Sequence, residues 1–412
     1  MPDYYDKLET RSPQDRESAL FHALPGQIEH AREKAPAYGA LFEGVNAKNI
    51  DSRTALAELP VTRKSELLER QSEAPPFGGF ATAASAEFSH IFASPGPIYE
   101  PEARRDDYWR MARALFAAGF RRGELVHNTF SYHFTPAGFM LESGAHALGC
   151  PVFPAGGGQT EWQIQAISQL KPSCYVGTPS FLKIILDKAE ESAADVSSIT
   201  KALVSGEALP PSLRQSLADR GIAVRQCYAT ADLGLIAYES EAMEGMIVDE
   251  GVIVEILRPG TGDPVDSGEV GEVVVTTFNP DYPLIRFATG DLSAVMEDPS
   301  PCGRTNWRIK GWMGRADQTT KVRGMFVHPS QVAAVVKRHA EVLKARLVIG
   351  SADNQDSMTL RCEVSEEPSE ALRAAIAESI RDLCKLRGQV AFDAPGSLAN
   401  DGKVIDDIRS YE

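Results

Sequence analysis

The sequence predicts an α/β protein with a large N-terminal domain of mainly parallel sheets flanked by helices, a β-rich subdomain, and a small C-terminal α+β domain. Between residues 107 and 228, short apolar runs alternate with segments at helical spacing, which is typical of βαβ units. From 251 to 277 the pattern changes to strands joined by a loop rich in Pro, Gly and Asp, which favours antiparallel pairing. From about residue 319, strands and helices alternate again.

Each element follows from its local pattern. Apolar residues at helical spacing, separated by prolines, predict helices over 18–34 and 65–73, and an apolar run predicts a strand that enters a Pro/Gly turn within 87–102. The central alternation predicts strands at 124–128, 151–154, 173–176, 202–205 and 223–228, and helices at 107–119, 135–148, 161–170, 179–190 and 211–220. The last part predicts strands at 321–326, 343–350, 358–364 and 389–392, and helices at 329–339 and 368–386.

Length and composition limit the possible classes of protein. A chain of 412 residues is too long for one core and suggests two or three domains. The net charge of −15 argues against nucleic acid as a main partner, because phosphate backbones bind basic faces. The sequence has no run of eighteen apolar residues, and its polar N-terminus is unlike a signal peptide. Six scattered cysteines without a C-x-x-C pair favour reduced thiols and a cytoplasmic location.

Two charged pairs lie in the stretch 282–324. Arg286 precedes Asp291 in R-F-A-T-G-D, and Arg315 precedes Asp317 in G-R-A-D. A carboxylate at the end of a strand suits two ribose hydroxyls, because it offers two acceptors in one plane. A nearby arginine can hold a phosphate with two parallel hydrogen bonds. The stretch therefore predicts a nucleotide site close to the domain boundary.

Several motifs occur in a fixed order along nearly the whole chain. They are L-P-V-T-R-K-S-E-L, A-A-G-F-R-R-G-E-L-V-H-N, P-A-G-G-G-Q-T-E-W-Q-I-Q, K-P-S-C-Y-V-G-T-P-S, S-G-E-A-L, Y-A-T-A-D-L-G, G-E-V-G-E-V-V-V-T, Y-P-L-I-R-F-A-T-G-D-L, G-R-A-D-Q, V-H-P-S-Q-V and a terminal G-K. With this set the chain resembles the adenylate-forming acyl-CoA ligases, and in detail the phenylacetate–CoA ligase branch.

The resemblance implies a two-domain ligase in which residues 1–315 form the large domain, 316–318 the hinge and 319–412 a mobile lid. ATP and a carboxylic acid, here an aryl or aryl-acetic acid, would give acyl-AMP with Mg²⁺, and CoA would then displace AMP. A homodimer is the family pattern. The implied roles are catalysis by Lys403 and Asp232, with Asp232 also near Mg²⁺; nucleotide binding by Ser205, Gly206, Glu207, Tyr228, Ala229, Arg286, Asp291 and Arg315; and a hinge at Asp317.

An acyl pocket is expected where an aromatic run and a glycine loop meet. The residues assigned to it are Tyr132, His133, Phe134, Gly156 and Gly157. The aromatic run suits a flat ring, but it also suits ordinary core packing. For His133, a polar contact to substrate and a packing role both remain open. His133 is not expected to bind a metal, because no potential second metal ligand lies nearby in sequence.

The sequence departs from the family pattern at two places. The loop that should wrap the phosphates is F-A-S-P-G-P-I-Y-E, where two prolines remove N–H donors and Glu100 adds negative charge. Some family members hold zinc through cysteines near 300, but here only Cys302 remains, so no structural zinc is expected. Two hypotheses follow: an active ligase, or a diverged homologue with impaired adenylation that binds nucleotide or acyl ligand, catalyses only thioester formation, or acts as an accessory protein.

Overall fold

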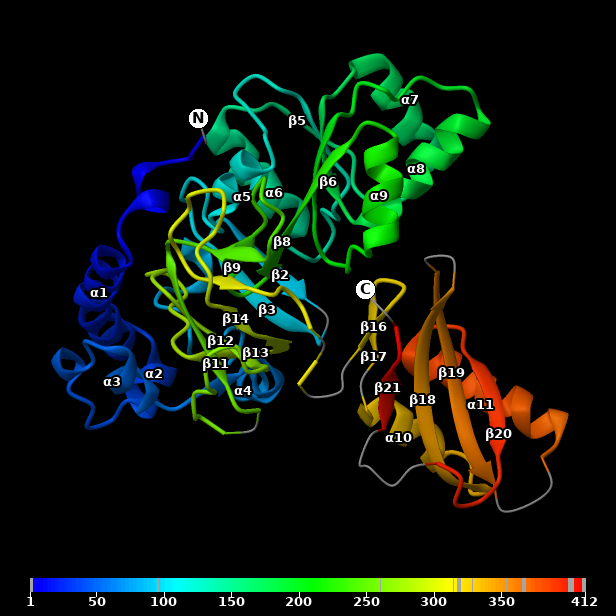
Figure 1. The fold of residues 1–412 in the computed structure, drawn as a ribbon. Coiled ribbons are helices and arrows are strands. Elements are labelled where there is room, and N and C mark those ends of the chain that lie inside the picture. The colour runs from blue at the N-terminus through cyan, green and yellow to red at the C-terminus, as the bar shows by residue number, and fades with distance from the viewer. Residues whose placement is uncertain are drawn as a thin grey trace. The chain divides into compact units, whose positions relative to one another are not determined.

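The computed structural model describes residues 3–94, 96–259, 261–313, 315–316, 320–327, 329–352, 355–364, 368–398 and 404–409. The chain divides into two compact units, Met1–Met313 and Gly314–Glu412 (Figure 1). Within the described ranges, every helix is too short or too polar to cross a bilayer.

The first unit contains most of the secondary structure. Its α-helices are α1 (Pro13–Lys34), α2 (Pro36–Leu41), α3 (Arg53–Ala57), α4 (Leu67–Glu73), α5 (Met111–Ala117), α6 (Ala137–Leu148), α7 (Thr160–Leu170), α8 (Pro179–Glu191) and α9 (Pro211–Asp219). Its 3₁₀ turns are η1 (Lys7–Thr10), η2 (Ala47–Asn49), η3 (Lys64–Glu66) and η4 (Ser85–Glu87). Its strands are β1 (Thr62–Arg63), β2 (His90–Ser94), β3 (Ile98–Glu102), β4 (Val126–Asn128), β5 (Val152–Pro154), β6 (Cys174–Gly177), β7 (Lys201–Val204), β8 (Ala223–Thr230), β9 (Gly234–Tyr238), β10 (Met246–Val248), β11 (Val252–Leu257), β12 (Gly271–Thr277), β13 (Phe287–Ser293), β14 (Val295–Met296) and β15 (Arg308–Ile309).

The large sheet confirms the predicted βαβ alternation. Its order is β14-β15-β10-β9-β8-β7-β6-β4-β5, and the strands from β8 to β5 run parallel. Helices α7, α8 and α9 lie together beside this part of the sheet (Figure 1). The junction between β6 and α8 shows how the sequence builds such a unit: Thr178 accepts a hydrogen bond from the Phe181 N–H as N-cap, and Pro179 occupies the first helical turn.

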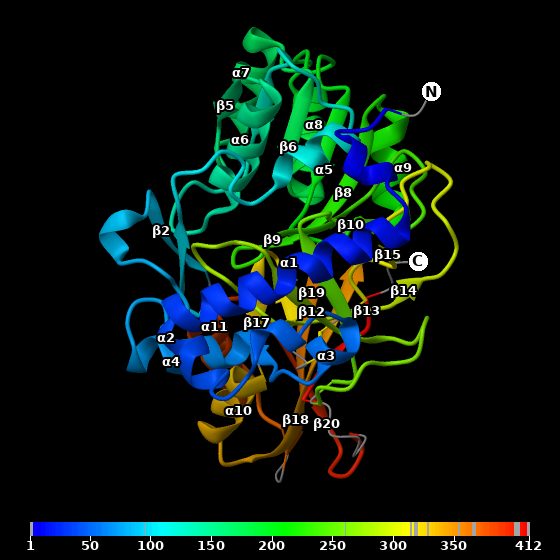
Figure 2. The same ribbon diagram turned by 90° about the vertical axis from the view of Figure 1, so that its left-hand side faces the viewer.

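A second sheet has the order β1-β13-β12-β11. The predicted antiparallel strands are β11 and β12, and β13 extends them. Strand β1 joins from far away in sequence and runs parallel to β13, with Thr62 opposite Phe287. The long helix α1, drawn in blue in Figure 2, packs its apolar face into the same core as this sheet. Strand β1 therefore brings the residues that follow it, beginning with Lys64, next to β13.

The stretch 87–102 forms a hairpin. Strand β2 pairs antiparallel with β3, from His90 opposite Glu102 to Ser94 opposite Ile98. The sequence predicted the first strand and the turn but not the returning strand. Along β3 the side chains of Ile98 and Glu100 are buried, whereas Tyr99 is exposed. The hairpin therefore directs a carboxyl group inward.

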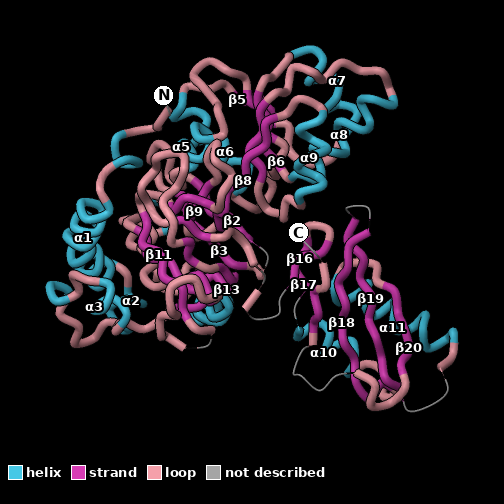
Figure 3. The backbone as a smooth tube through the Cα atoms, in the orientation of Figure 1, coloured by secondary structure: helices cyan, strands magenta, loops and turns pink. Residues whose placement is uncertain are grey.

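The second unit is an α+β structure whose sheet is visible in Figure 3. Its elements are β16 (Thr320–Val322), β17 (Met325–Val327), α10 (Pro329–Lys337), β18 (Val342–Ala352), β19 (Gln355–Val364), α11 (Glu370–Cys384), β20 (Gln389–Asp393) and β21 (Ile405–Asp407). The sheet order is β20-β19-β18-β21, and helices α10 and α11 share a buried apolar cluster with it. The predicted helices and the strands at 343–350, 358–364 and 389–392 are present. The single strand predicted at 321–326 is wrong, because a turn at Arg323–Gly324 divides it into the antiparallel strands β16 and β17, and β21 was not predicted.

Candidate nucleotide site

A tyrosine and a carboxylate predicted from two separate motifs meet in the first unit. The Tyr228 hydroxyl donates to Asp291 Oδ2 at 2.8 Å, and it lies 3.1 Å from Thr289 Oγ1. The Trp312 indole N–H donates to Asp291 Oδ1 at 3.1 Å. The Asp291 N–H donates to the Thr289 hydroxyl oxygen within the irregular part of β13, where its register with β12 shifts. Strands β8 and β13 thus position an aromatic ring beside an oriented carboxylate.

Ser205 lies next to this pair at the end of β7. Its N–H donates to the Gly177 carbonyl at 3.2 Å, and its hydroxyl donates at 2.9 Å to the carbonyl of Cys227, the residue before Tyr228. Gly206 follows with φ of +80°, which an L side chain rarely adopts. Glu207 accepts a hydrogen bond from Ser180 at 2.6 Å. The segment 205–207 therefore lies at the carboxyl ends of parallel strands, where ligands bind in sheets of this kind.

Asp232 forms an ion pair that the sequence did not predict. Its side chain is fully buried, and Oδ2 is bonded to the Lys64 ammonium group. Oδ1 is also buried and has no hydrogen-bond partner among the described residues. A buried carboxylate requires a nearby positive charge, and Lys64 supplies it. The motif from Tyr228 to Asp232 is therefore tied to the segment that follows β1.

Glu100 lies close to this ion pair. Its carboxyl group accepts a hydrogen bond from the Ser94 N–H at 3.2 Å and shares one of 2.5 Å with the Ser94 hydroxyl. Burial, and next the neighbouring Asp232 carboxylate, raise the pKa of Glu100 to about 8, although the Lys64 ammonium opposes the shift. Glu100 therefore holds a proton at neutral pH.

We expect Glu100→Gln to flatten the dependence of stability on pH. Because the folded protein raises the pKa of Glu100 from 4.5 to about 8, wild-type stability falls as the pH rises between these values. The variant keeps the shape of the side chain and has no proton to lose. Its free energy of unfolding is expected to equal that of wild type at pH 4.5 and to exceed it by a few kcal/mol at pH 8.5. Urea unfolding at both pH values tests this, and an equal pH slope in both proteins would contradict it.

Arg286 has a structural role, which corrects the expectation that it binds the nucleotide. It is only 1% exposed, and all of its guanidinium N–H groups are engaged. Nε and Nη2 donate to Glu255 at 3.1 and 3.0 Å, and the remaining donors reach the backbone carbonyls of Ala57, Leu59 and Gly262. The guanidinium joins β13 to β11 and to two loops, and none of its donors is available to a phosphate.

The loops predicted to form the acyl pocket lie side by side. The Gly156 N–H donates to the Asn128 carbonyl at 3.0 Å, and β4 pairs with β5. The Tyr132 hydroxyl donates to Glu142 at 2.7 Å and accepts from the Asn128 amide at 2.8 Å.

His133 and Gly157 are exposed, and the Phe134 side chain is 82% exposed. The Phe134 carbonyl accepts from the Ala93 N–H, which connects this loop to the β2–β3 hairpin. The Phe134 side chain is thus not part of the core.

Gln163 fixes the glycine loop. Its amide donates to the carbonyls of Gly156 at 2.8 Å and Gly158 at 3.1 Å. Its Oε1 lies 2.5 Å from His127 Nε2, and the His127 ring stacks on Phe153. Burial lowers the pKa of His127, whereas the hydrogen bond to Gln163 opposes the shift. The neutral imidazole and the amide therefore hold this loop in one conformation.

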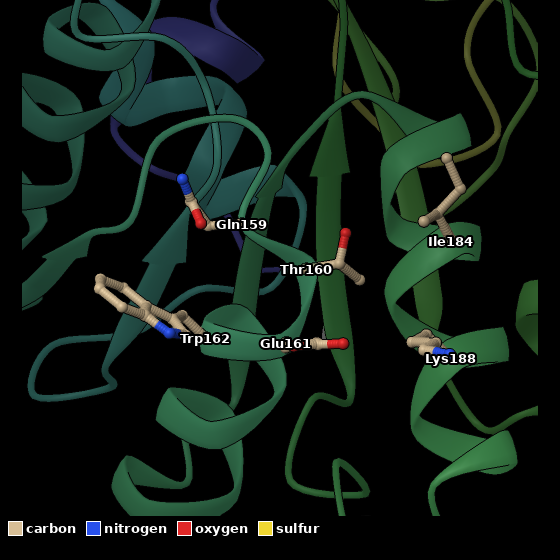
Figure 4. A pocket seen from close by; sticks show the side chains of 6 residues that line it. All are labelled: Gln159, Thr160, Glu161, Trp162, Ile184 and Lys188. Atoms are coloured by element: carbon tan, nitrogen blue, oxygen red, sulfur yellow. The ribbon is translucent and has the colours of Figure 1, made fainter.

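A surface hollow of about 420 Å³ lies beyond the glycine loop. It is lined by Gln159, Thr160, Glu161, Trp162, Ile184 and Lys188 from α7, α8 and the residue before α7 (Figure 4). Trp162 and Ile184 are 73% and 51% exposed. None of the predicted site residues lines this hollow, so it is separate from the candidate nucleotide site.

Three predicted residues follow Met313, the last residue of the first unit. Arg315 is described and belongs to the second unit, whereas Asp317 and Lys403 lie outside the described residues. In the described ranges, no group of three or more His, Cys, Asp or Glu side chains is arranged to hold a metal ion. All six cysteines are free and buried.

The sequence analysis missed four residues that shape these sites: Lys64, Gln163, Thr289 and Trp312. Lys64, Gln163 and Thr289 lie within motifs given above, and Trp312 lies two residues before G-R-A-D-Q, but the sequence does not show their contacts. Lys64 contacts a residue 168 positions away in the chain, and no local pattern reports such a pair.

Comparison with known proteins identifies related enzymes. A family model described as "AMP-binding enzyme" matches residues 108–279. Phenylacetate-coenzyme A ligase of Thermus thermophilus is 29% identical, with 94% of this chain and 91% of that protein covered. The enzyme of the same name from Escherichia coli is 27% identical, covering 97% and 94%. A crystal structure of 2-hydroxyisobutyryl-CoA ligase with 2-HIB-AMP and CoA superposes with a TM-score of 0.84 at 25% identity, covering 98% of this chain and 92% of that one.

Proposed function

The chain belongs to the AMP-binding, adenylate-forming superfamily as an enzyme of the AMP-forming carboxylate–CoA ligase family, and on this premise we propose that it activates an aryl or aryl-acetic acid. In the proposed reaction, the carboxylate attacks the α-phosphorus of ATP and pyrophosphate leaves. The CoA thiolate then attacks the acyl carbon of acyl-AMP, and AMP leaves. The names of the relatives, which are phenylacetate-coenzyme A ligases, favour an aryl-acetic acid.

The observation that carries the proposal is the Tyr228–Asp291 pair. Tyr228 and Trp312 donate to different oxygens of the Asp291 carboxylate, which holds its plane in one orientation. A carboxylate held in this way offers two acceptors in one plane, which suits a pair of ribose hydroxyls. The Tyr228 ring would lie along the adenine, and the segment 205–207, with Ala229, would border it. Arg315 would contact the ribose or phosphate.

Charge neutralisation at the phosphates is proposed for Asp232 and Lys403. Asp232 Oδ1 is a buried carboxylate oxygen without a hydrogen-bond partner among the described residues, so it fits a magnesium ligand whose other ligands are phosphate oxygens. Bound Mg²⁺ would neutralise charge on the pyrophosphate leaving group. Lys403 would stabilise the charge that develops between the carboxylate and the α-phosphate. Movement of the second unit about Asp317 would allow one site to catalyse both half-reactions.

A pyrophosphate exchange assay tests the proposed function. Labelled pyrophosphate is expected to enter ATP only when a suitable acid is present, and a panel of benzoic and phenylacetic acids identifies which one. Exchange at background level with the whole panel would refute the ligase proposal. That result would favour the second candidate, a homologue with impaired adenylation. The altered phosphate loop, in which Glu100 is bonded to Ser94, is the observation that favours this candidate.

We expect Asp291→Ala to weaken AMP binding by about 10- to 100-fold, because it removes charged acceptors of two ribose hydroxyls. Calorimetric titration of AMP measures this. Asp281→Ala is the matched control, since Asp281 pairs with Arg105 and lies outside the Tyr228–Asp291 cluster. Unchanged AMP affinity in a folded Asp291→Ala protein would show that Asp291 does not bind the ribose.

A further inference from the structure

In the β2–β3 hairpin, a side chain on the second strand accepts hydrogen bonds from donors at the end of the first strand. Ser94 ends β2, at the position where the family's phosphate loop is expected. Its N–H and its hydroxyl both bond to the Glu100 carboxyl group, at 3.2 and 2.5 Å. Backbone N–H groups and hydroxyls in a turn are the donors that bind phosphate oxygens. In this protein a side chain of the same hairpin takes both of them.

Glu100 is buried at this position. It is 1% exposed and Ser94 is 7% exposed, so the contact is part of the packed interior. The Asp232 carboxylate raises the pKa of Glu100 and the Lys64 ammonium lowers it, so the Lys64–Asp232 ion pair acts electrostatically on this carboxyl group. Asp232 in turn follows Tyr228 at the end of β8. The carboxyl group that bonds the hairpin donors thus interacts electrostatically with the Lys64–Asp232 pair of the candidate nucleotide site.

We propose that Glu100 occupies the end of the site that would hold the β- and γ-phosphates, so that the site favours AMP over ATP. This inference rests on the proposed function. ATP and pyrophosphate need the Ser94 donors, whereas AMP and acyl-AMP have no β- or γ-phosphate. Glu100 therefore hinders adenylation and leaves the thioester-forming half-reaction unaffected. It sets which nucleotide the enzyme prefers.

Calorimetric titration of AMP and of ATP with Mg²⁺, at pH 7 and on the full chain, tests the inference. Wild type is expected to bind AMP about tenfold or more tightly than ATP. Glu100→Ser frees both Ser94 donors and is expected to lower the Kd for ATP about tenfold while the Kd for AMP stays within about twofold. Glu102→Ser is the matched control on the same strand, where Glu102 pairs with His90 outside the proposed site, and its ratio of affinities is expected to equal that of wild type.

Two results would overturn the inference and leave the proposed function intact. One is a wild-type protein that binds ATP as tightly as AMP, which requires no variant. The other is a folded Glu100→Ser protein with an unchanged ratio of ATP to AMP affinity. If wild type binds neither nucleotide, the proposed nucleotide site fails and the inference fails with it.

Discussion

Replacing Arg286 by methionine is expected to destabilise the first unit by about 3–5 kcal/mol, because it leaves the Glu255 carboxylate buried without its partner. Glu255 is 8% exposed, and the Arg286 guanidinium is its bidentate partner. The same change leaves the carbonyls of Ala57, Leu59 and Gly262 without their donor. Burial raises the pKa of Glu255, whereas Arg286 opposes the shift, so loss of the arginine favours protonation of this carboxyl group.

Urea unfolding followed by tryptophan fluorescence measures this effect in the first unit alone. All four tryptophans, Trp109, Trp162, Trp307 and Trp312, belong to that unit. Lys188→Met is the control, because the Lys188–Glu191 pair is exposed and solvent-screened, so its loss is expected to leave the free energy of unfolding nearly unchanged. The structural role would be contradicted if Arg286→Met lost as little free energy of unfolding as the control and also bound AMP more weakly. That result would support the role predicted from the sequence, in which Arg286 binds the nucleotide.

The elements with a local signal could be predicted from the sequence. The helices and strands of the second unit, such as α11 and β18, have strong periodicity and appear where the pattern indicates. Strand β1 has only two residues and pairs with β13 more than two hundred positions later. Strand β21 is short and pairs in parallel with β18. Such pairings depend on tertiary contacts, and a single sequence carries no local sign of them.

The site shows the same limit at the level of side chains. Tyr228 and Asp291 were predicted from separate motifs, and in the structure the Tyr228 hydroxyl lies 2.8 Å from Asp291 Oδ2. Arg286 looked equally suited to a ligand, because a sequence shows that an arginine is present but not where its donors point. Glu100 was predicted to add negative charge near the phosphates, but burial raises its pKa to about 8, so it holds a proton at neutral pH. Its hydrogen bonds to Ser94, however, depend on the register of a hairpin whose second strand was not predicted.

Replacing Lys403 by alanine is expected to reduce the rate of acyl-AMP formation by about 10²- to 10³-fold. Removing one preorganised group that stabilises developing negative charge in a transition state typically costs this much in rate. The expectation rests on the terminal G-K motif, because Lys403 lies outside the described residues. Pyrophosphate exchange measures the adenylation half-reaction, and release of AMP from supplied acyl-AMP and CoA measures the other. Lys385→Ala, also in the second unit, is the control. If Lys403 acts only during adenylation, exchange falls and thioester formation stays within about twofold of wild type. An equal loss in both half-reactions would instead indicate a general role in folding or nucleotide binding.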